Sequence, residues 1–438
     1  MHLIDFIHDL TWDDLPEPVQ HQARRCLLDT AGAGIGGRAT DLARIVHDFA
    51  AAAYGGHGAA LWQDGRLVSP PGAALANGMT VDALDIHDGH VLTKGHAGAA
   101  LAPAVFATLK LGAGPVSGRE LLTSLVVGYE VALRAGMALH ASACDYHTSG
   151  AWNALGCAAL TARRLGCGPE ATRHALGIAE YHGPRSQMMR CIEFPTMLKD
   201  GSGWGAMAGV SAGLLAAQGF TGAPAITVEA AAMAEWWSNL GETWHITEQY
   251  FKPHAVCRWA QPAMEGALAL QRLHAIDPGA IRRIRVLTFR EAAELRCPRP
   301  RTTEEAQYSL PYPVAAALYY RGVGPEALSG AALRHEPVLR LADLVEVMAD
   351  PALSARFPAE RLAHITIEMI DGTGYELREA APRWNWFDAP SDEDLLDKFR
   401  WLARAGLTEA RAEALANALW NCADLPVAEA LAELLAAP

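Results

Sequence analysis

The spacing of apolar residues is the sequence feature that most constrains the fold of this chain. The spacing is typical of helices over most of the length and typical of strands over one internal stretch. From the start to about residue 270 the sequence is rich in Ala, Gly and Leu, and apolar residues follow helical spacing, as at Val19, Ala23 and Leu27. Further runs that are typical of central helices cover residues 118–141, 151–165, 169–180 and 205–218. We therefore predict a large helical domain over residues 1–270.

The period changes near residue 277. Ile284, Val286 and Thr288 alternate with their neighbours, which is typical of a strand. Residues 365–370 and 375–377 flank the turn sequence Asp371-Gly372-Thr373-Gly374 and predict a hairpin. Helical stretches at 312–320 and 338–348 lie between these strands, so residues 271–390 are predicted to form a smaller α+β domain.

The last section, residues 391–438, is predicted to be helical again. Ser391, with Asp394 three residues later, matches the pattern of a helix N-cap. These helices could pack back on the first domain, which would leave the α+β domain as an insertion. The predicted fold class is mainly α, with a helical domain built from both chain ends.

Charge and cysteine usage exclude some classes of function. The formal net charge of -13 disfavours nucleic acid or an anionic membrane as a partner, because both require a basic surface. The chain has no run of 18 apolar residues, and its acidic first segment does not resemble a signal peptide, so we expect a cytoplasmic protein. The 8 cysteines form no Cys-x-x-Cys motif and are expected to be free thiols.

One glycine motif is misleading. Gly32, Gly34 and Gly37 match the dinucleotide-binding fingerprint, which has meaning only after a strand. Because a predicted helix precedes them here, they indicate a closely packed helix end.

The segment DIHDGHVLTKGH concentrates acidic and imidazole side chains: Asp85, His87, Asp88, His90 and His96. Divalent metals accept such ligands, but the spacing lacks a helical context and indicates a metal only weakly. The histidines could also cap helices or face solvent. The favoured interpretation is a metal-free acid/base site.

Four further segments combine titratable residues with Gly, Pro or aromatic residues, as expected of loops that carry a site on a rigid scaffold. They are YHTSGAW, MLKDGSGWGA, YFKPHAVCRWAQP and AQYSLPYPVAAAL. His96 and His147 are candidates for general acid/base catalysis because imidazole titrates near neutral pH. Lys199 and Lys252 could bind substrate carboxylates or stabilise an enolate-like charge.

The same segments offer supporting groups. Asp85 and Asp88 could orient an imidazole or contact the substrate, and Tyr312 could donate a hydrogen bond or a proton. Arg258 could add to the binding of carboxylates, although a structural role is equally compatible with its position.

In this order, the segments also carry a resemblance. It rests on Asn77-Gly78 before Ala83-Leu84-Asp85, the His96 loop, Gly128-Tyr129-Glu130-Val131, Tyr146-His147-Thr148, and Lys252-Pro253 with Cys257-Arg258. Nearly the whole chain resembles the MmgE/PrpD family, which includes 2-methylcitrate dehydratase, cis-aconitate decarboxylase and iminodisuccinate epimerase.

The resemblance implies a homodimer without a cofactor. Each subunit would have an all-helical domain built from both chain ends and an inserted smaller α+β lid domain, with the site between them. The implied active-site positions are Asp85, His96, His147, Lys199, Lys252 and Tyr312.

Four positions depart from the family pattern and affect the expected substrate. His87 stands where Asp or Asn is common, Gly89 where Thr is common, His254 where Tyr is common, and Gln261 where His is common. The Gly89 difference removes a hydroxyl near the expected substrate.

The expected function is metal-independent acid/base chemistry beside a carboxylate of a small di- or tricarboxylic acid. Dehydration of a 2-methylcitrate-like hydroxy acid is expected first, epimerisation or isomerisation second, and decarboxylation third. A metal-dependent hydrolase would instead use Asp85, Asp88, His90 and His96 as ligands. A non-catalytic polycarboxylate-binding protein is the remaining alternative.

Overall fold

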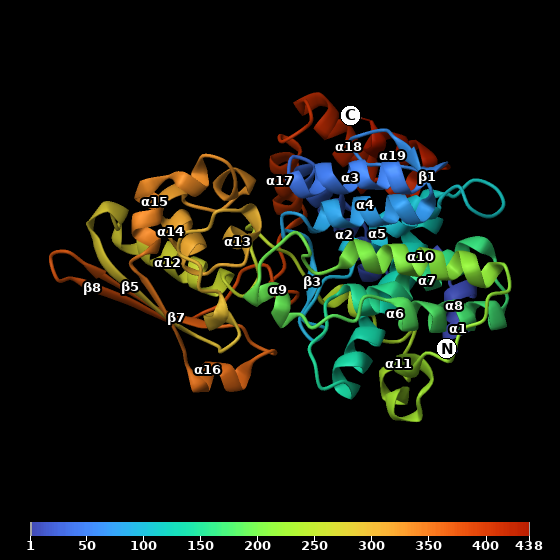
Figure 1. Ribbon diagram of the computed structural model, residues 1–438, viewed down its shortest axis with the longest axis horizontal. Helices are drawn as coiled ribbons and strands as arrows, with labels where there is room; N and C mark the ends of the chain where they lie inside the picture. Colours follow the sequence, from blue (N-terminus) through green and yellow to red (C-terminus); the bar gives the residue numbers. More distant parts are fainter. Residues whose placement is uncertain (1, 438) are drawn as a thin grey trace.

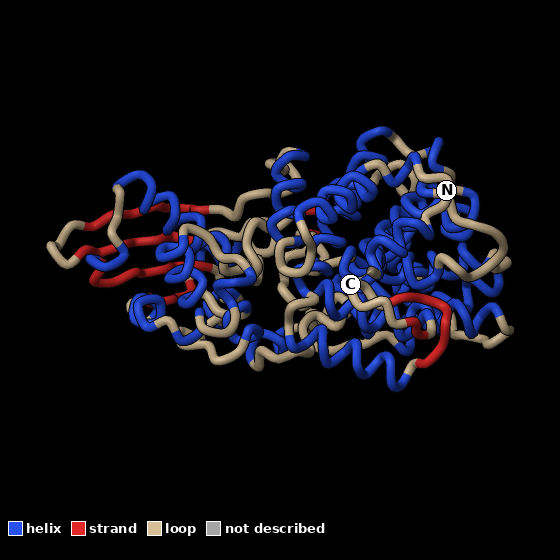
Figure 2. The backbone as a smooth tube through the Cα atoms, turned by 90° about the horizontal axis from the view of Figure 1, so that it is seen from above, coloured by secondary structure: helices blue, strands red, loops and turns tan. Residues whose placement is uncertain are grey.

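The computed structural model describes residues 2–437 and has two lobes joined by several crossing segments (Figure 1). Both chain ends lie in the larger, helical lobe, whereas the main sheet lies at the far end of the smaller lobe (Figure 2). The first part of the larger lobe contains the helices α1 (Leu3–Asp9), α2 (Glu17–Gly37), α3 (Asp41–Ala53), α4 (Pro70–Asp82), α5 (Gly98–Thr108), α6 (Gly118–Ser142), α7 (Gly150–Leu165), α8 (Pro169–His182), α9 (Met189–Glu193), α10 (Ser202–Ala217) and α11 (Ile226–Glu229). Two short strands, β1 (Gly55–Ala60) and β2 (Leu67–Val68), pair beside them.

The predicted central helices are confirmed. Helix α10 packs against α7 and α4, and a methyl group added at Gly209 would clash with the Ala154 carbonyl, so small residues allow the close approach. Among the described residues, α6 is the one helix long and apolar enough to cross a membrane, but its most apolar window is entirely buried within the protein. The apolar composition of α6 therefore fits a helix in the core of the protein.

The C-terminal section packs on α2. It consists of α17 (Asp392–Ala403), α18 (Glu409–Trp420) and α19 (Glu429–Ala436), and Ser391 caps α17 in a capping box with Asp394. A Cβ at Gly32 would lie 3.1 Å from Phe399 of α17, and one at Gly34 would lie 2.8 Å from the ring of Trp62. These glycines therefore serve helix packing and follow no strand.

The smaller lobe contains a four-stranded sheet in the order β6-β5-β7-β8. Its elements are α12 (Gln261–His274), β5 (Ile281–Thr288), α13 (Thr303–Gln307), α14 (Pro311–Tyr320), α15 (Glu336–Ala342), β6 (Val345–Ala349), α16 (Pro351–Arg356), β7 (Ala363–Met369) and β8 (Gly374–Ala380). The predicted strand at β5 and the β7–β8 hairpin are confirmed.

Two details differ from the sequence prediction. The helix predicted over 338–348 ends at Ala342, and β6 follows, parallel to β5, because Val345 and Val347 pair with that strand. Helix α12 already packs on β7 and β8, although the change in period placed the start of the smaller domain at residue 271. Apolar residues keep helical spacing through α12. The change to strand spacing therefore shows where the first strand of the smaller lobe begins, and not where the chain enters that lobe.

A two-stranded ladder joins the loop after α4 to the segment that leads into the smaller lobe. Strand β3 (Gly89–His90) pairs with β4 (Gln249–Tyr250), with Gly89 opposite Tyr250. This ladder brings DIHDGHVLTKGH and YFKPHAVCRWAQP together, although about 160 residues separate them.

Candidate active site

The centre of the candidate site is a buried ion pair beside an imidazole. Nζ of Lys252 donates to the Asp85 carboxylate at 2.6 Å and to the Asp85 carbonyl at 2.9 Å. Nε2 of His96 lies 3.8 Å from the same carboxylate. Lys252 has no exposed surface, and burial alone would lower its pKa, but the Asp85 carboxylate outweighs burial and raises that pKa above the ordinary lysine value. Three predicted site residues therefore meet here.

Asp85 itself has an unusual backbone. Its φ of 50° lies in the left-handed region, which side chains other than Gly, Asn and Asp rarely adopt. This conformation lets both the carbonyl and the carboxylate of one residue face the same ammonium. An aspartate is thus suited to this position by its backbone as well as by its charge.

The orientation of His96 assigns its tautomer. Nδ1 lies 2.6 Å from the Asp88 carbonyl, and because a carbonyl can only accept, Nδ1 carries the proton and donates it. Nε2 is left with a lone pair toward Asp85. Burial, followed by the charge of Lys252, lowers the pKa of His96 well below its ordinary value. The imidazole is therefore neutral at neutral pH and can accept a proton at Nε2.

Asp88 differs from its expected role in contacting substrate. Its carboxylate accepts a hydrogen bond of 2.6 Å from the Tyr129 hydroxyl, in the core of the larger lobe. Burial raises the pKa of Asp88 to about 6. Its side chain thus anchors the loop, while its carbonyl orients His96.

Lys199 belongs to a second cationic position. Its Nζ donates a short hydrogen bond to the side chain of Gln307 and lies 4.6 Å from the centre of the Tyr308 ring. Gln307 also donates to the Ala83 carbonyl at 2.9 Å, two residues before Asp85. Lys199 is 1% exposed and makes no ion pair among the described residues, so its charge is open to an anionic ligand.

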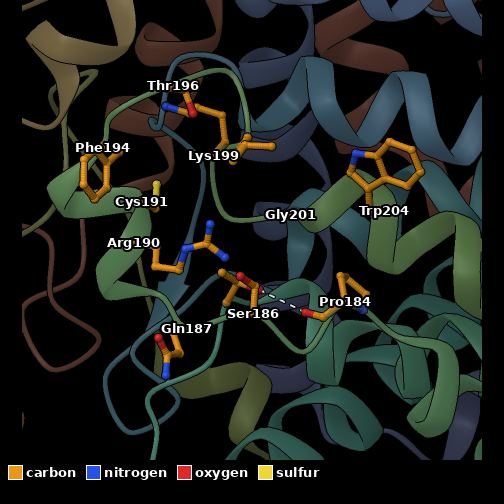
Figure 3. A pocket seen from close by; sticks show the side chains of 12 residues that line it. Pro184, Ser186, Gln187, Arg190, Cys191, Phe194, Thr196, Lys199, Gly201 and Trp204 are labelled. Atoms are coloured by element: carbon orange, nitrogen blue, oxygen red, sulfur yellow. Dashed lines mark hydrogen bonds between the residues drawn. The ribbon is translucent and has the colours of Figure 1, made fainter.

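A cavity of about 250 Å³ opens beside Lys199 (Figure 3). Its lining includes Thr148, Arg190, Cys191 and Trp204. Arg190 is exposed and forms no ion pair with any residue that the structure describes. The cavity therefore presents two cations that form no ion pair with a described carboxylate.

A buried acidic pair links the two halves of the site. Asp82 accepts from His87 at 3.1 Å and from the backbone N–H of Asp200 at 3.2 Å. Burial raises the pKa of Asp200 to about 7, with the charge of Asp82 as the second cause. Ser149 donates a short hydrogen bond to Asp200 and accepts from the His96 backbone N–H at 2.9 Å. This network fixes the loop on which His96 lies.

His147 lies at the start of the same Ser149 segment and is 7% exposed. Its Nδ1 donates to the Asp145 carbonyl at 2.9 Å, so its Nε2 also has a lone pair. No direct contact joins His147 to Asp85 or Lys252 among the described residues. The structure thus places it on a neighbouring loop and not in the central cluster.

Arg258 is buried, and protein groups accept hydrogen bonds from both of its terminal nitrogens, whereas its Nε has no partner among the described residues. It donates to the Phe251 carbonyl at 3.1 Å, to Gln261 at 2.9 Å and to Asn385 at 2.8 Å, and burial lowers its pKa to about 9. Gln261, one of the positions that depart from the family pattern, therefore accepts from this guanidinium. Arg258 supports the loop around β4, which differs from the expected direct binding of substrate.

Tyr312 is not brought to the cluster by any contact. Its hydroxyl donates to the Ala327 carbonyl at 2.7 Å and lies 3.2 Å from the Ala332 carbonyl, both in the smaller lobe. Tyr308, which follows α13 and precedes α14, lies against Lys199 instead. The repeated Tyr and Pro residues in AQYSLPYPVAAAL gave no basis for choosing between the two tyrosines.

Replacing Tyr312 by phenylalanine is expected to affect stability more than turnover. Loss of the hydrogen bond to Ala327 should lower the free energy of unfolding by about 0.5–1.5 kcal/mol. Urea unfolding and steady-state rates of Tyr312→Phe measure the two effects separately. A large loss of turnover at unchanged stability would return Tyr312 to the active site.

The four ligands of the metal alternative do not converge. Asp88 accepts from Tyr129, and the carboxylate of Asp85 already contacts the ammonium of Lys252. His90 points toward Glu248, with 3.0 Å between Nε2 and the carboxylate. A metal site made of Asp85, Asp88, His90 and His96 is therefore not formed.

Two other groups have potential ligand atoms within 4.8 Å of one another: His90, His245 and Glu248, and Asp82, Asp85 and His87. In the first, the Thr93 N–H donates to Nδ1 of His90 at 3.3 Å, so Nε2 carries a proton and donates to Glu248. In the second, Lys252 already pairs with Asp85. In both groups, hydrogen bonds or an ion pair within the protein explain why these side chains lie close together.

Sequence models of two domains match consecutive parts of the chain. The MmgE/PrpD N-terminal domain matches residues 1–243, and the MmgE/PrpD C-terminal domain matches residues 254–422. The chain belongs to the MmgE/PrpD family. The acid/base residues and cations described above are therefore those of an MmgE/PrpD protein.

Individual relatives of this MmgE/PrpD protein extend over its whole length. A cis-aconitate decarboxylase-like protein, oryM of Aspergillus oryzae, is 25% identical over 99% of this chain and 96% of its own. The cis-aconitate decarboxylase of Homo sapiens is 26% identical over 99% of this chain and 93% of its own. The cis-aconitate decarboxylase of Aspergillus terreus is 29% identical over 39% of this chain and 36% of its own.

Proposed function

We propose that this MmgE/PrpD protein is a lyase that decarboxylates cis-aconitate or a closely similar unsaturated tricarboxylic acid without a metal. The main support is the neutral His96 beside the Asp85–Lys252 pair, in a chain that is similar over its full length to proteins named cis-aconitate decarboxylase. Dehydration of a 2-methylcitrate-like acid, expected first from the sequence, becomes the second candidate, because the relatives described above carry the name of a decarboxylase.

The cations fit the charge that such a reaction develops. When the bond to a departing carboxylate breaks, its electron pair moves into the allylic system and onto a neighbouring carboxylate. Lys199, which has no ion-pair partner among the described residues, would hold a carboxylate of the substrate. Lys252 would stabilise the carbanionic centre while remaining paired with Asp85. Preorganised cations in a buried site stabilise such charge more than water does.

His96 would move the proton. Its lone pair at Nε2 suits removal of a proton from carbon in a dehydration, and uptake and return of a solvent proton in a decarboxylation. His147, on the neighbouring loop, is the second histidine that could serve this role. Because His96 is 9% exposed, and Asp85 and Lys252 are less so, the substrate needs an opening step to reach them. We propose that the smaller lobe acts as a lid that moves in this step.

The resemblance also implies a homodimer, which remains a proposal. Exposed Phe194, Leu198 and Trp204 near the Lys199 loop would suit contact with a second copy. Light scattering should then give about twice the chain mass of 46.8 kDa.

The test is proton NMR of chelator-treated protein in D₂O with cis-aconitate, 2-methylcitrate and an imino dicarboxylate. We expect loss of CO₂ from cis-aconitate with deuterium entering the product methylene group. Formation of an alkene from 2-methylcitrate alone would instead establish the dehydratase. Conversion that appears only after a divalent metal is restored would contradict the proposal.

A further inference from the structure

The phenol of Tyr250 is an unassigned group beside the central cluster. It lies on β4 opposite Gly89, is 2% exposed, and its ring centre is 6.3 Å from that of His96. Its hydroxyl makes no hydrogen bond to any residue in the described range 2–437. The residue is almost wholly buried, and its hydroxyl is left free to donate to a ligand or a water.

Gly89 is what admits this phenol. A Cβ built on Gly89 would lie 2.5 Å from the Tyr250 oxygen and 2.7 Å from Nδ1 of His96, both closer than real Cβ contacts. Any larger residue at position 89 would therefore displace the phenol, the imidazole or both. The hydroxyl of Tyr250 thus occupies space that a side chain at position 89 would need.

Two guanidinium groups accompany the ring. The centre of the Tyr250 ring is 4.6 Å from Arg258 and 5.6 Å from Arg361, which precedes β7. Arg361 is 5% exposed and forms no ion pair among the described residues. Its only hydrogen bond there is a long one, 3.4 Å, to the Val91 carbonyl, and its buried Nε has no partner. This charge is therefore free to act on the phenol or on an anion beside it.

We propose that Tyr250 is a proton donor of the active site, which delivers its hydroxyl proton to the carbon that becomes carbanionic during the reaction. This inference rests on the proposed decarboxylation. In that step the C–C bond to the departing carboxylate breaks, and CO₂ leaves. The electron pair shifts through the allylic system and forms a new C–H bond with the proton of Tyr250. His96 returns to the resulting phenolate the proton that it takes up from solvent, so one proton is consumed for each CO₂ released.

The surroundings of the ring suit both states of the phenol. Burial raises the pKa of Tyr250, so the hydroxyl retains its proton at neutral pH until the substrate requires it. The nearby cations act in the opposite direction and stabilise the phenolate once it forms. The titratable or charged side chains that face the ring are Arg361, Lys252, Arg258, Asp85, Tyr146 and His96.

The experiment compares the unchanged protein with Tyr250→Phe, with cis-aconitate in D₂O. We expect kcat to fall by about 100-fold or more, as for loss of a general acid, with KM changed much less. The unchanged protein should place deuterium at one of the two positions of the product methylene group, and Tyr250→Phe should lose this stereospecificity. A merely structural tyrosine would not affect it. Tyr320→Phe, which removes a partly exposed phenol that bonds His335, is the matched control and should behave as the unchanged protein.

Outcomes for the two proposals are separable. If the unchanged protein converts no tricarboxylate, the proposed function fails. If it converts cis-aconitate and Tyr250→Phe retains both kcat and stereospecific deuteration, the role of Tyr250 is overturned.

Arg361→Gln tests the role of Tyr250 independently if Tyr250→Phe does not fold. Arg361→Gln leaves the phenol in place and removes one cation near it, so the alkaline limb of kcat should move to higher pH and kcat should fall. An unchanged alkaline limb with unchanged kcat would overturn the inference.

Discussion

Replacing His96 with asparagine should lower kcat by about 10²–10⁴-fold, the usual effect of losing a general acid or base. The asparagine amide can still donate to the Asp88 carbonyl, as Nδ1 of His96 does at 2.6 Å, but it offers nothing in place of Nε2. The loop conformation should therefore survive while proton transfer does not. Because Lys199 and Lys252 remain, KM should change much less than kcat.

Steady-state kinetics and thermal unfolding of His96→Asn check this result. His174→Asn is the matched control, since that imidazole lies on α8 and contacts the Gly222 backbone. If His147→Asn abolished turnover while His96→Asn retained it, the roles of the two histidines would be exchanged.

Most of the fold follows from the sequence because its helices have strong local patterns. The apolar faces of α6, α7 and α10 and the capping box at Ser391 are local features, and the structure contains them where predicted. The sequence predicts a helix over β6 because its short apolar stretch fits a helix and a strand equally well. Only its parallel neighbour β5, which lies more than 50 residues earlier, makes it a strand.

The candidate site could be predicted only as a set of segments. Sequence patterns indicated that the loops of His96, Lys199 and Lys252 carry chemistry, and the fold brings Asp85, His96 and Lys252 together. They could not indicate the direction of a side chain. Asp85 and Asp88 are three residues apart, yet one carboxylate meets Lys252 and the other meets Tyr129.

Some groups near the site gave no signal in the sequence. Arg361 lies between α16 and β7, outside the segments in which titratable residues gather. Only the folding of the chain brings it close to Tyr250. Gln307 ends α13, in a segment whose tyrosines and prolines are its more distinctive sequence features. From the sequence, Gly89 indicates only that a side chain is missing at this position. It does not indicate that the phenol of Tyr250 on β4 lies against this glycine.

Replacing Lys398 with methionine should lower the free energy of unfolding by about 3–5 kcal/mol, the cost of breaking a buried ion pair from one side. Nζ of Lys398 donates to Asp29 at 2.6 Å and to the Ile86 carbonyl at 2.6 Å, and both acidic and basic side chains are at most 3% exposed. Because methionine has a shape similar to that of lysine, the loss of stability should reflect the lost charge and not lost packing. Asp29 would keep a buried carboxylate with no cation.

Urea unfolding of Lys398→Met and of the double variant with Asp29→Leu checks this prediction. Removing both charges should restore much of the lost stability, because a buried ion pair can be replaced by apolar side chains at little cost. If the double variant were no more stable than the single one, lost packing and not the unpaired charge would explain the effect. The single variant should also lower kcat, since Lys398 holds the carbonyl of the residue next to Asp85. Helix α17 would then act on the site from the C-terminal end of the chain, through one hydrogen bond.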